Sequence, residues 1–363
     1  MDSDKDSRFI PVNDTCNMLE MTLSFPEQLE EAYQIAEKQE LIKINHIPSS
    51  IATIGMGGSG ICGNIVATSA IENIKMPVFS FRDYTVPEYI DDKCLVFAIS
   101  YSGNTIETLT SLKALLDRSL RNIITISSGG ILEQVSQKFN LPHIKIPAGR
   151  PPRASLGYLL IPIIVSLGKL GLFNRYEDTI KEVIKEVEAL RTDVNADIPV
   201  ENNIAKDVAI QIKGKLPIVY GTGEAMGVVA ERWAGQFQEN AKVLTFNRTF
   251  PELCHNQAIG WEDASGIADK CVVISLEGEW EKGAKVEQRG ALLDIVKGKG
   301  IPVLHINITG DGGLPAIIRA IYLGDFISIY LSALNNVDPC SIGGINSVKE
   351  RIAPYIDKLN LLS

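Results

Sequence analysis

Short apolar segments that alternate with amphipathic helical stretches constrain the fold of this chain more than any other feature. Residues 51–55, 94–99 and 122–127 are rich in aliphatic side chains, and each segment precedes a turn and a helical pattern. Strand–helix alternation at this spacing is typical of a parallel sheet with helices on both faces. Residues 94–99 are apolar at every position, as in a strand covered on both faces. The sequence therefore predicts an α/β fold.

The same strand–turn–helix pattern occurs twice along the chain. Residues 216–224 repeat the apolar strand and glycine turn of residues 51–60, and residues 271–278 resemble residues 94–103. The copies are similarly spaced, 166 residues from Gly55 to Gly221 and 175 from Ser100 to Ser275. We interpret them as two copies of one α/β unit.

Size and charge exclude some classes of function. A chain of 363 residues with 45% hydrophobic residues has room for about two domains. Its net charge of -9 argues against broad binding to nucleic acid or to an anionic membrane. The apolar stretch 156–173 is interrupted by Pro162 and Lys169, so we expect a buried core helix there and not a membrane span.

The six cysteines show neither a C-x-x-C spacing nor a metal-like pairing with the four histidines. This pattern predicts a reduced, cytoplasmic protein without a metal site. Residues 1–20 are polar and acidic, so we expect a loosely ordered arm and no secretory signal.

A glycine-rich turn follows the first expected strand. Four of the six residues 55–60 are glycines, which predicts an irregular turn before a helix over residues 61–71. The free N–H groups of a helix N-terminus would make this turn an anion site, with Gly58 and Ser59 in it. The glycines also satisfy the dinucleotide pattern G-x-G-x-x-G, but no acidic residue is clearly placed about 20 positions later.

A second candidate anion site follows residues 94–99. Ser100, Ser102 and Thr105 carry three hydroxyls around Gly103, at a strand end and a helix start. Such hydroxyls are suited to bind three phosphate oxygens. The alternative is N-capping by Thr105 or Ser102, which needs only one hydroxyl. In the second copy Glu277 stands where the first has Ser102, and a carboxylate would repel phosphate, so we expect a phosphate site in the first copy alone.

Three later segments contain further ionisable candidates. Two prolines before Arg153 would hold its guanidinium in place beside a helix start, where it could bind an anion. Glu239 and His255 lie in a stretch with no clean helical or strand pattern, after an expected helix over residues 225–237. A solvated loop with Glu239 as a surface charge is the alternative. Lys349, in an expected final helix, is by itself typical of a surface lysine.

The motifs together resemble a known family. Gly-Gly-Ser-Gly at 57–60, Ser-Tyr-Ser-Gly-Asn-Thr at 100–105 and the duplicated unit are similar to the sugar isomerase (SIS) domain superfamily. The segments 152–155, 239–242 and 251–256 resemble a narrower group, the bifunctional phosphoglucose/phosphomannose isomerases of archaea and some bacteria. The resemblance runs from about residue 20 to the C-terminus. One departure is Cys254, where the family commonly has asparagine, which bears on how His255 is oriented.

The resemblance implies two similar SIS-type subdomains, each a parallel sheet flanked by helices. The expected boundaries are an arm over 1–20, a first domain over 21–195 and a second domain, including the C-terminal helix, over 196–363. The implied reaction interconverts glucose 6-phosphate, and also mannose 6-phosphate, with fructose 6-phosphate through a cis-enediolate. It implies neither a cofactor nor a metal.

The resemblance also assigns roles. Glu239 would move the proton between C2 and C1, His255 would assist ring opening and Arg153 would stabilise the enediolate. Lys349 would lie near the ring oxygen. Five residues would hold the phosphate: Gly58, Ser59, Ser100, Ser102 and Thr105. The implied assembly is a homodimer in which His255 reaches the partner's active site.

Two other functions fit the same fold. One is a non-catalytic sugar-phosphate sensor, against which the set of glutamate, arginine, histidine and lysine argues. The other is a different SIS-fold phosphosugar isomerase. Tolerance of both C2 epimers depends on hydroxyls near C2, and Ser341 is a candidate only by its position in the sequence.

Overall fold

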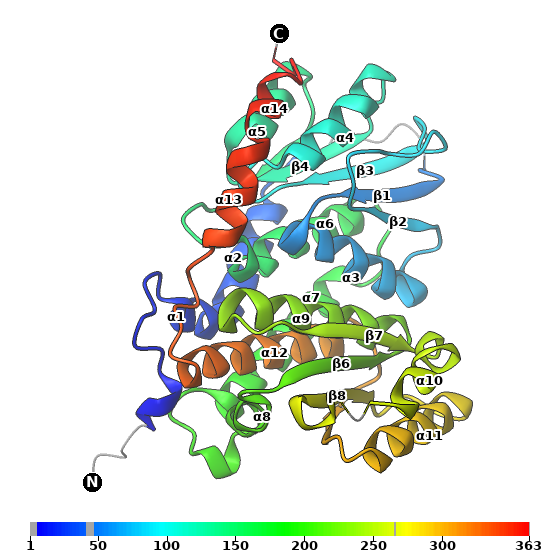
Figure 1. The fold of residues 1–363 in the computed structure, drawn as a ribbon. Coiled ribbons are helices and arrows are strands. Elements are labelled where there is room, and N and C mark those ends of the chain that lie inside the picture. Colours follow the sequence, from blue (N-terminus) through cyan, green and yellow to red (C-terminus); the bar gives the residue numbers. More distant parts are fainter. Residues whose placement is uncertain (1–5, 41–46, 265, 363) are drawn as a thin grey trace. The chain divides into compact units, whose positions relative to one another are not determined.

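The computed structural model describes residues 6–40, 47–264 and 266–362, and its contacts divide the chain into two compact units (Figure 1). Residues 24–181 and 342–363 form the first-sheet unit. Residues up to Leu23 and residues 182–341 form the second-sheet unit. Each unit has one parallel sheet flanked by helices, so the α/β expectation and the duplication are confirmed.

The first-sheet unit has five parallel strands in the order β2-β1-β3-β4-β5. The strands are β1 (Ser50–Ile54), β2 (Val78–Phe81), β3 (Cys94–Ile99), β4 (Ile123–Ser127) and β5 (His143–Lys145). The helices are α2 (Phe25–Glu37), α3 (Gly57–Asn73), α4 (Ile106–Asp117), α5 (Gly130–Lys138), η2 (Pro152–Ala154), α6 (Leu156–Lys169), α13 (Gly343–Ile352) and α14 (Pro354–Asp357).

Apolar side chains cover both faces of this sheet. On one face, leucines of α4 and α5, including Leu112 and Leu132, pack against strand residues such as Val96. Helices α3 and α6 lie on the other face (Figure 1). Leu361, beyond α14, is buried in the α4–α5 core, so the end of the chain packs with the first sheet.

The second-sheet unit repeats this arrangement with four parallel strands in the order β7-β6-β8-β9. The strands are β6 (Leu216–Thr222), β7 (Phe246–Phe250), β8 (Cys271–Gly278) and β9 (Val303–Ile308). The helices are η1 (Ser7–Phe9), α1 (Met18–Leu23), η3 (Val200–Asn202), α8 (Ile204–Ile212), α9 (Gly223–Ala241), η4 (Glu252–His255), α10 (Gln257–Glu262), η5 (Ala268–Lys270), α11 (Ala284–Gly298) and α12 (Leu314–Leu334). Helix α7 (Tyr176–Val194) contains the boundary between the units.

Helix α12 is the central core helix of the second-sheet unit. It packs against α9 and α8, and nearly all of its side chains are buried. It is also long and apolar enough to cross a membrane, but 78% of its most apolar window is buried within the protein. Both α12 and the interrupted apolar stretch, now α6, are therefore core helices by their burial.

Three sequence-based expectations are wrong in detail. The turn 57–60 is not irregular but forms the first turn of α3, because tertiary packing outweighs the low helix propensity of glycine. The arm is not loose over its described part, since Phe9 is fully buried and residues 18–23 are helical. The helical spacing of apolar residues from Ser24 to about Ile42 predicts an entry helix, but α2 ends at Glu37, and the last expected residues lie outside the described part.

The contact division also differs from the expected domain boundaries. The arm packs within the second-sheet unit, where the Phe9 ring lies edge-on to that of Tyr330. Residues 342–363 belong to the first-sheet unit because Leu361 and its neighbours join the core of that sheet. Each unit is thus built from two separate parts of the chain.

Candidate active site

A cradle of hydroxyl groups lies at the carboxyl ends of β1 and β3 in the first-sheet unit. Ser100 Oγ is 2.8 Å from Thr105 Oγ1. Thr105 is the N-cap residue of α4, yet its side chain makes no capping hydrogen bond. N-capping therefore does not account for the Thr105 hydroxyl, which instead faces Ser100 beside the start of the helix.

Backbone groups hold the other two hydroxyls. The Tyr101 N–H donates to Ser59 Oγ at 3.3 Å, which joins the glycine turn to the serine loop. The Asn104 N–H donates to Ser102 Oγ at 3.2 Å. Ser100 and Ser59 are buried, whereas Ser102 is exposed. The serine loop and the start of α3, both expected from sequence to bind an anion, therefore share one site, which we call the hydroxyl cradle (Ser59, Ser100, Ser102, Thr105).

Two glycines allow this close packing. Gly103 has φ +71°, and a Cβ there would lie 1.8 Å from the Gly129 carbonyl oxygen. A Cβ on Gly58 would lie 3.0 Å from the Pro152 oxygen and 3.5 Å from the Arg153 nitrogen. The first turn of α3 therefore lies directly against η2, the element that carries Arg153.

Arg153 is 3% exposed, so the structure supports a fixed guanidinium at this position. Tyr101 reinforces the arrangement, because its hydroxyl donates to the Pro147 oxygen at 3.1 Å and accepts from the Arg150 N–H at 2.9 Å. Tyr101 was not expected from the sequence to be a site residue. Its position between Ser100 and Ser102 could have indicated this role, because an aromatic side chain there can reach the next segment of the chain.

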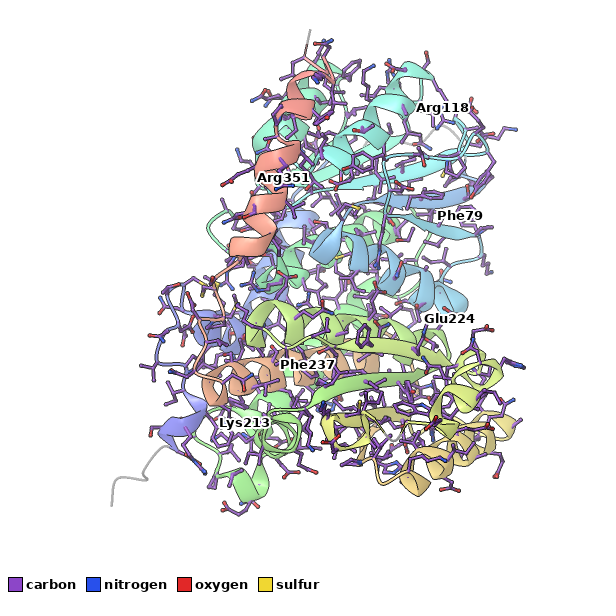
Figure 2. All side chains as sticks on the ribbon, in the orientation of Figure 1. Phe79, Arg118, Lys213, Glu224, Phe237 and Arg351 are labelled. Atoms are coloured by element: carbon purple, nitrogen blue, oxygen red, sulfur yellow. A yellow bond between two sulfur atoms is a disulfide. The ribbon has the colours of Figure 1, made fainter. Side chains whose placement is uncertain are left out.

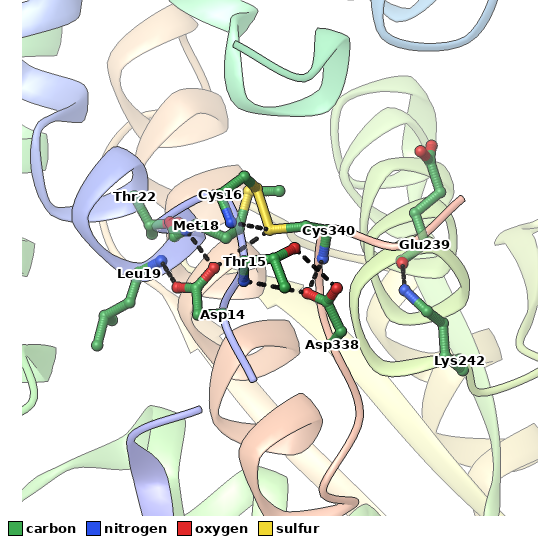
Figure 3. Close-up of a disulfide and its surroundings, with 10 residues drawn as sticks. All are labelled: Asp14, Thr15, Cys16, Met18, Leu19, Thr22, Glu239, Lys242, Asp338 and Cys340. Carbon is green, nitrogen blue, oxygen red and sulfur yellow. Dashed lines mark hydrogen bonds between the residues drawn. A yellow bond between two sulfur atoms is a disulfide. The ribbon is translucent and has the colours of Figure 1, made fainter. Parts of the chain in front are cut away.

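Glu239 lies on α9 of the second-sheet unit, in the last turn of the helix and not in the irregular segment expected from sequence. Buried polar pairs fix this helix on α12: Asn240 donates to Ser328 Oγ at 2.9 Å, and Gln236 donates to Asp325 at 2.6 Å. Glu239 itself is half-buried. The Lys242 ammonium donates to the Glu239 carbonyl oxygen at 2.6 Å (Figure 3).

His255 ends the short helix η4 and is exposed. The residues before it anchor the loop, since Leu253 is buried in the core and Cys254 Sγ donates to the Gln288 oxygen at 3.8 Å. Burial raises the pKa of the Cys254 thiol. Cys254 thus points to α11 and leaves the imidazole of His255 exposed.

Lys349 lies on α13, a helix with no buried residue. Figure 2 labels Arg351, two positions later, on the same exposed helix. The first-sheet unit therefore carries the hydroxyl cradle, Arg153 and Lys349. Glu239 and His255 belong to the second-sheet unit.

Among the described residues, the strand ends of the second sheet carry a charged cluster in place of a hydroxyl cradle. Arg289 donates to Thr222 Oγ1 at 3.0 Å, is hydrogen-bonded to Glu281, and lies 3.7 Å from Glu277. Glu277 also contacts His305 Nδ1 at 2.7 Å. Burial raises the pKa of Glu281, partly offset by Arg289. Glu277 lies within β8, whereas Ser102 lies in the loop after β3, so the expected correspondence of these two positions stays a prediction.

The expectation that the cysteines are reduced is wrong for two of the six, Cys16 and Cys340. Cys16 and Cys340 form a disulfide with a Cα–Cα distance of 5.8 Å, although 324 positions separate them in the sequence. The spacing of cysteines along the sequence does not reveal a contact between two residues that only the fold brings together. Among the described residues, the one metal-like cluster is Asp14, Cys16 and Cys340. Because its two sulfurs are bonded to each other, it has no thiolate to offer a metal.

Comparisons with known proteins extend these observations. Residues 201–352 match the family described as bacterial phospho-glucose isomerase C-terminal SIS domain. A bifunctional phosphoglucose/phosphomannose isomerase from Caldicellulosiruptor bescii is 36% identical over 94% of this chain and its own full length. The enzyme of that name from Aquifex aeolicus is 29% identical over 90% of this chain and its own full length.

Solved structures resemble the fold. A hypothetical protein from Thermus thermophilus has a TM-score of 0.72 at 16% identity, covering 94% of this chain and 91% of its own. The C-terminal domain of glucosamine-fructose-6-phosphate aminotransferase from Francisella tularensis has a TM-score of 0.63 at 15% identity, covering 88% and 96%. At these identities the likeness concerns the fold alone.

Proposed function

Because this chain belongs to the bifunctional phosphoglucose/phosphomannose isomerase family, we propose that its residues carry out the aldose–ketose isomerisation of 6-phosphosugars as follows. The activity is the interconversion of glucose 6-phosphate and mannose 6-phosphate with fructose 6-phosphate. The observation that carries the assignment is 36% identity over 94% of the chain, together with a hydroxyl cradle at the expected strand ends.

The hydroxyl cradle and Gly58 bind the phosphate. The Ser100–Thr105 hydroxyl pair and the start of α3 support this role, since hydroxyls and free helix N–H groups donate to phosphate oxygens. Arg153, buried against the same turn, supplies a fixed cation. Its proposed role is to stabilise the negative charge of the enediolate.

Glu239 is the base that moves the proton between C2 and C1. Proton abstraction next to a carbonyl needs a carboxylate at a fixed position and a donor for the developing oxyanion. The buried hydrogen bonds that fix α9 on α12 support such positioning. A carboxylate that returns the proton to the adjacent carbon completes the isomerisation without consuming a cofactor.

His255 assists ring opening, and Lys349 assists near the ring oxygen. Both side chains are exposed, as groups that meet a substrate or a partner subunit must be. Large apolar side chains on the elements next to His255 are exposed as well, namely Leu244, Phe246 and Ile259. Such a surface favours burial against a second copy. We therefore infer a homodimer, and a cytoplasmic location, where charged phosphosugars are retained.

The direct test is the Glu239→Gln variant, assayed with fructose 6-phosphate while glucose 6-phosphate and mannose 6-phosphate are measured separately. We expect wild-type protein to form both products, and the variant to lose about 1,000-fold or more in kcat while its thermal unfolding is unchanged. Glu224→Gln, an exposed position on the same helix, is the matched control and should keep wild-type activity. Near wild-type turnover in a folded Glu239→Gln protein would contradict the role of Glu239.

A further inference from the structure

The disulfide between Cys16 and Cys340 joins two segments of the second-sheet unit that are far apart in the sequence and that also share a hydrogen bond from the Thr15 hydroxyl to Asp338. Cys16 lies between η1 and α1, and Cys340 lies in the connection that follows α12. Both cysteines are half-buried, and the neighbouring Thr15 is exposed. The sulfur pair is thus within reach of a small reductant or of an exposed dithiol on another protein.

The surroundings of the disulfide suit both its oxidised and its reduced form. The Cys16 N–H donates to Cys340 Sγ at 3.1 Å, and Asp14 Oδ1 lies 3.2 Å from the same sulfur (Figure 3). Asp14 is held in place because it also accepts from the Met18 and Leu19 N–H groups at the start of α1. After reduction, the Cys340 thiol would have Asp14 as a ready hydrogen-bond acceptor.

The segment that ends at Cys340 lies against the end of α9, which carries Glu239. Asn335 donates to the Ala241 oxygen at 3.3 Å. Burial raises the pKa of Asp338, but hydrogen bonds from Cys340 and Thr15, with the charge of Lys242, bring it below its usual range. Lys242 in turn donates to the Glu239 carbonyl oxygen (Figure 3). A contiguous series of contacts therefore joins the disulfide to the last turn of α9.

We propose that Cys16 and Cys340 form a reversible modification site that sets the activity of the isomerase. A dithiol reductant attacks one sulfur and the S–S bond breaks. The two cysteines gain two electrons and two protons and become thiols, while the reductant becomes a disulfide. The freed segment 335–341 then holds α9 less firmly, and turnover falls. This inference rests on the proposed role of Glu239.

The test uses the full-length protein, oxidised in air or reduced with dithiothreitol, with alkylation and mass spectrometry to count free thiols. We expect four alkylated cysteines in the oxidised protein and six after reduction. We expect reduction to lower kcat about 5- to 10-fold with less than a two-fold change in KM, and reoxidation to restore it. Hydrogen exchange should rise in segment 335–341 and in the last turn of α9.

Two variants separate the disulfide from other causes. Cys16→Ser should have the low kcat of the reduced protein under both conditions, whereas Cys254→Ser should respond to dithiothreitol like the wild type. If Cys16→Ser fails to fold, the reduced and reoxidised wild-type protein still decides the question. Six alkylated cysteines in air-oxidised protein, or unchanged kcat and KM with all six thiols free, would overturn the proposal. Glu239→Gln tests the proposed function separately, because its turnover should be lost in both redox states.

Discussion

The two sheets of this protein share the order of four parallel strands but differ in the chemistry at their carboxyl ends. At the first sheet, Ser100 and Thr105 face each other 2.8 Å apart, in a loop that Gly103 folds tightly. At the second sheet, Glu277 near the end of β8 lies 3.7 Å from Arg289 of α11. A duplicated scaffold thus keeps its geometry while one copy retains neutral donors for an anion. In the other copy, Arg289 pairs with Glu277 and Glu281.

The largest effect is expected when the second copy's carboxylate is placed in the first. Ser102→Glu would put a negative charge beside the phosphate dianion, and one pair of charges about 4 Å apart near a surface costs about 4 kcal/mol. We expect kcat/KM for fructose 6-phosphate to fall about 1,000-fold. Ser102→Gln, similar in size but neutral, is the control and should lose about 10-fold or less. Equal losses in both variants would show that size and not charge matters.

A glycine pair compares the backbone of the serine loop with that of the end of β8. Gly103→Ala requires a left-handed backbone and brings Cβ 1.8 Å from the Gly129 oxygen, so we expect about 3 kcal/mol of destabilisation. Gly278→Ala, at the last residue of β8, meets the Trp280 side chain and has no positive φ. Because a side chain can move more easily than the backbone, Gly278→Ala should destabilise the protein less than Gly103→Ala. Thermal unfolding of both variants measures the difference, and equal melting temperatures would contradict this reasoning.

A serine pair tests which copy binds the substrate. Ser100→Ala removes a donor to a charged phosphate, worth about 1.5–2 kcal/mol, so KM should rise about 10- to 30-fold with a smaller change in kcat. Ser275, its counterpart, is buried, and its hydroxyl has no hydrogen-bond partner among the described residues. Ser275→Ala should therefore leave KM and stability near wild type. Steady-state kinetics with fructose 6-phosphate measures KM for both variants. A rise in KM for Ser275→Ala and not for Ser100→Ala would contradict this assignment.

The smallest effect on activity is expected from the reverse exchange. Glu277→Ser removes one carboxylate beside Arg289 and the partner of His305, but Arg289 keeps Glu281. We expect a loss of about 1 kcal/mol in stability and kinetic constants within two-fold of wild type. Isothermal titration with inorganic phosphate should still show one site per chain. A second phosphate site in this variant would mean that Glu277 alone prevents the second sheet from binding phosphate.

The local parts of this structure were predictable from sequence, and the non-local parts were not. The apolar strand at Cys94–Ile99 agrees with the expected bounds, because its pattern is uninterrupted. The serine loop and the fixed position of Arg153 were also expected, since glycine, proline and hydroxyl residues act locally on the backbone.

The rest depends on contacts between distant residues. Glu239 lies in a helix because Asn240 bonds to Ser328, 88 positions away. The disulfide joins residues 324 positions apart, and Leu361 packs in the core of the first sheet. Neither contact leaves a periodic pattern in the sequence. No spacing rule could have shown them.

The most direct test of the central claim is a crystal structure of the wild-type protein with fructose 6-phosphate bound. We expect the phosphate within hydrogen-bond distance of Ser59, Ser100, Ser102 and Thr105, and no phosphate at the strand ends of the second sheet. A phosphate bound beside Thr222 and Arg289, with the hydroxyl cradle empty, would contradict the account.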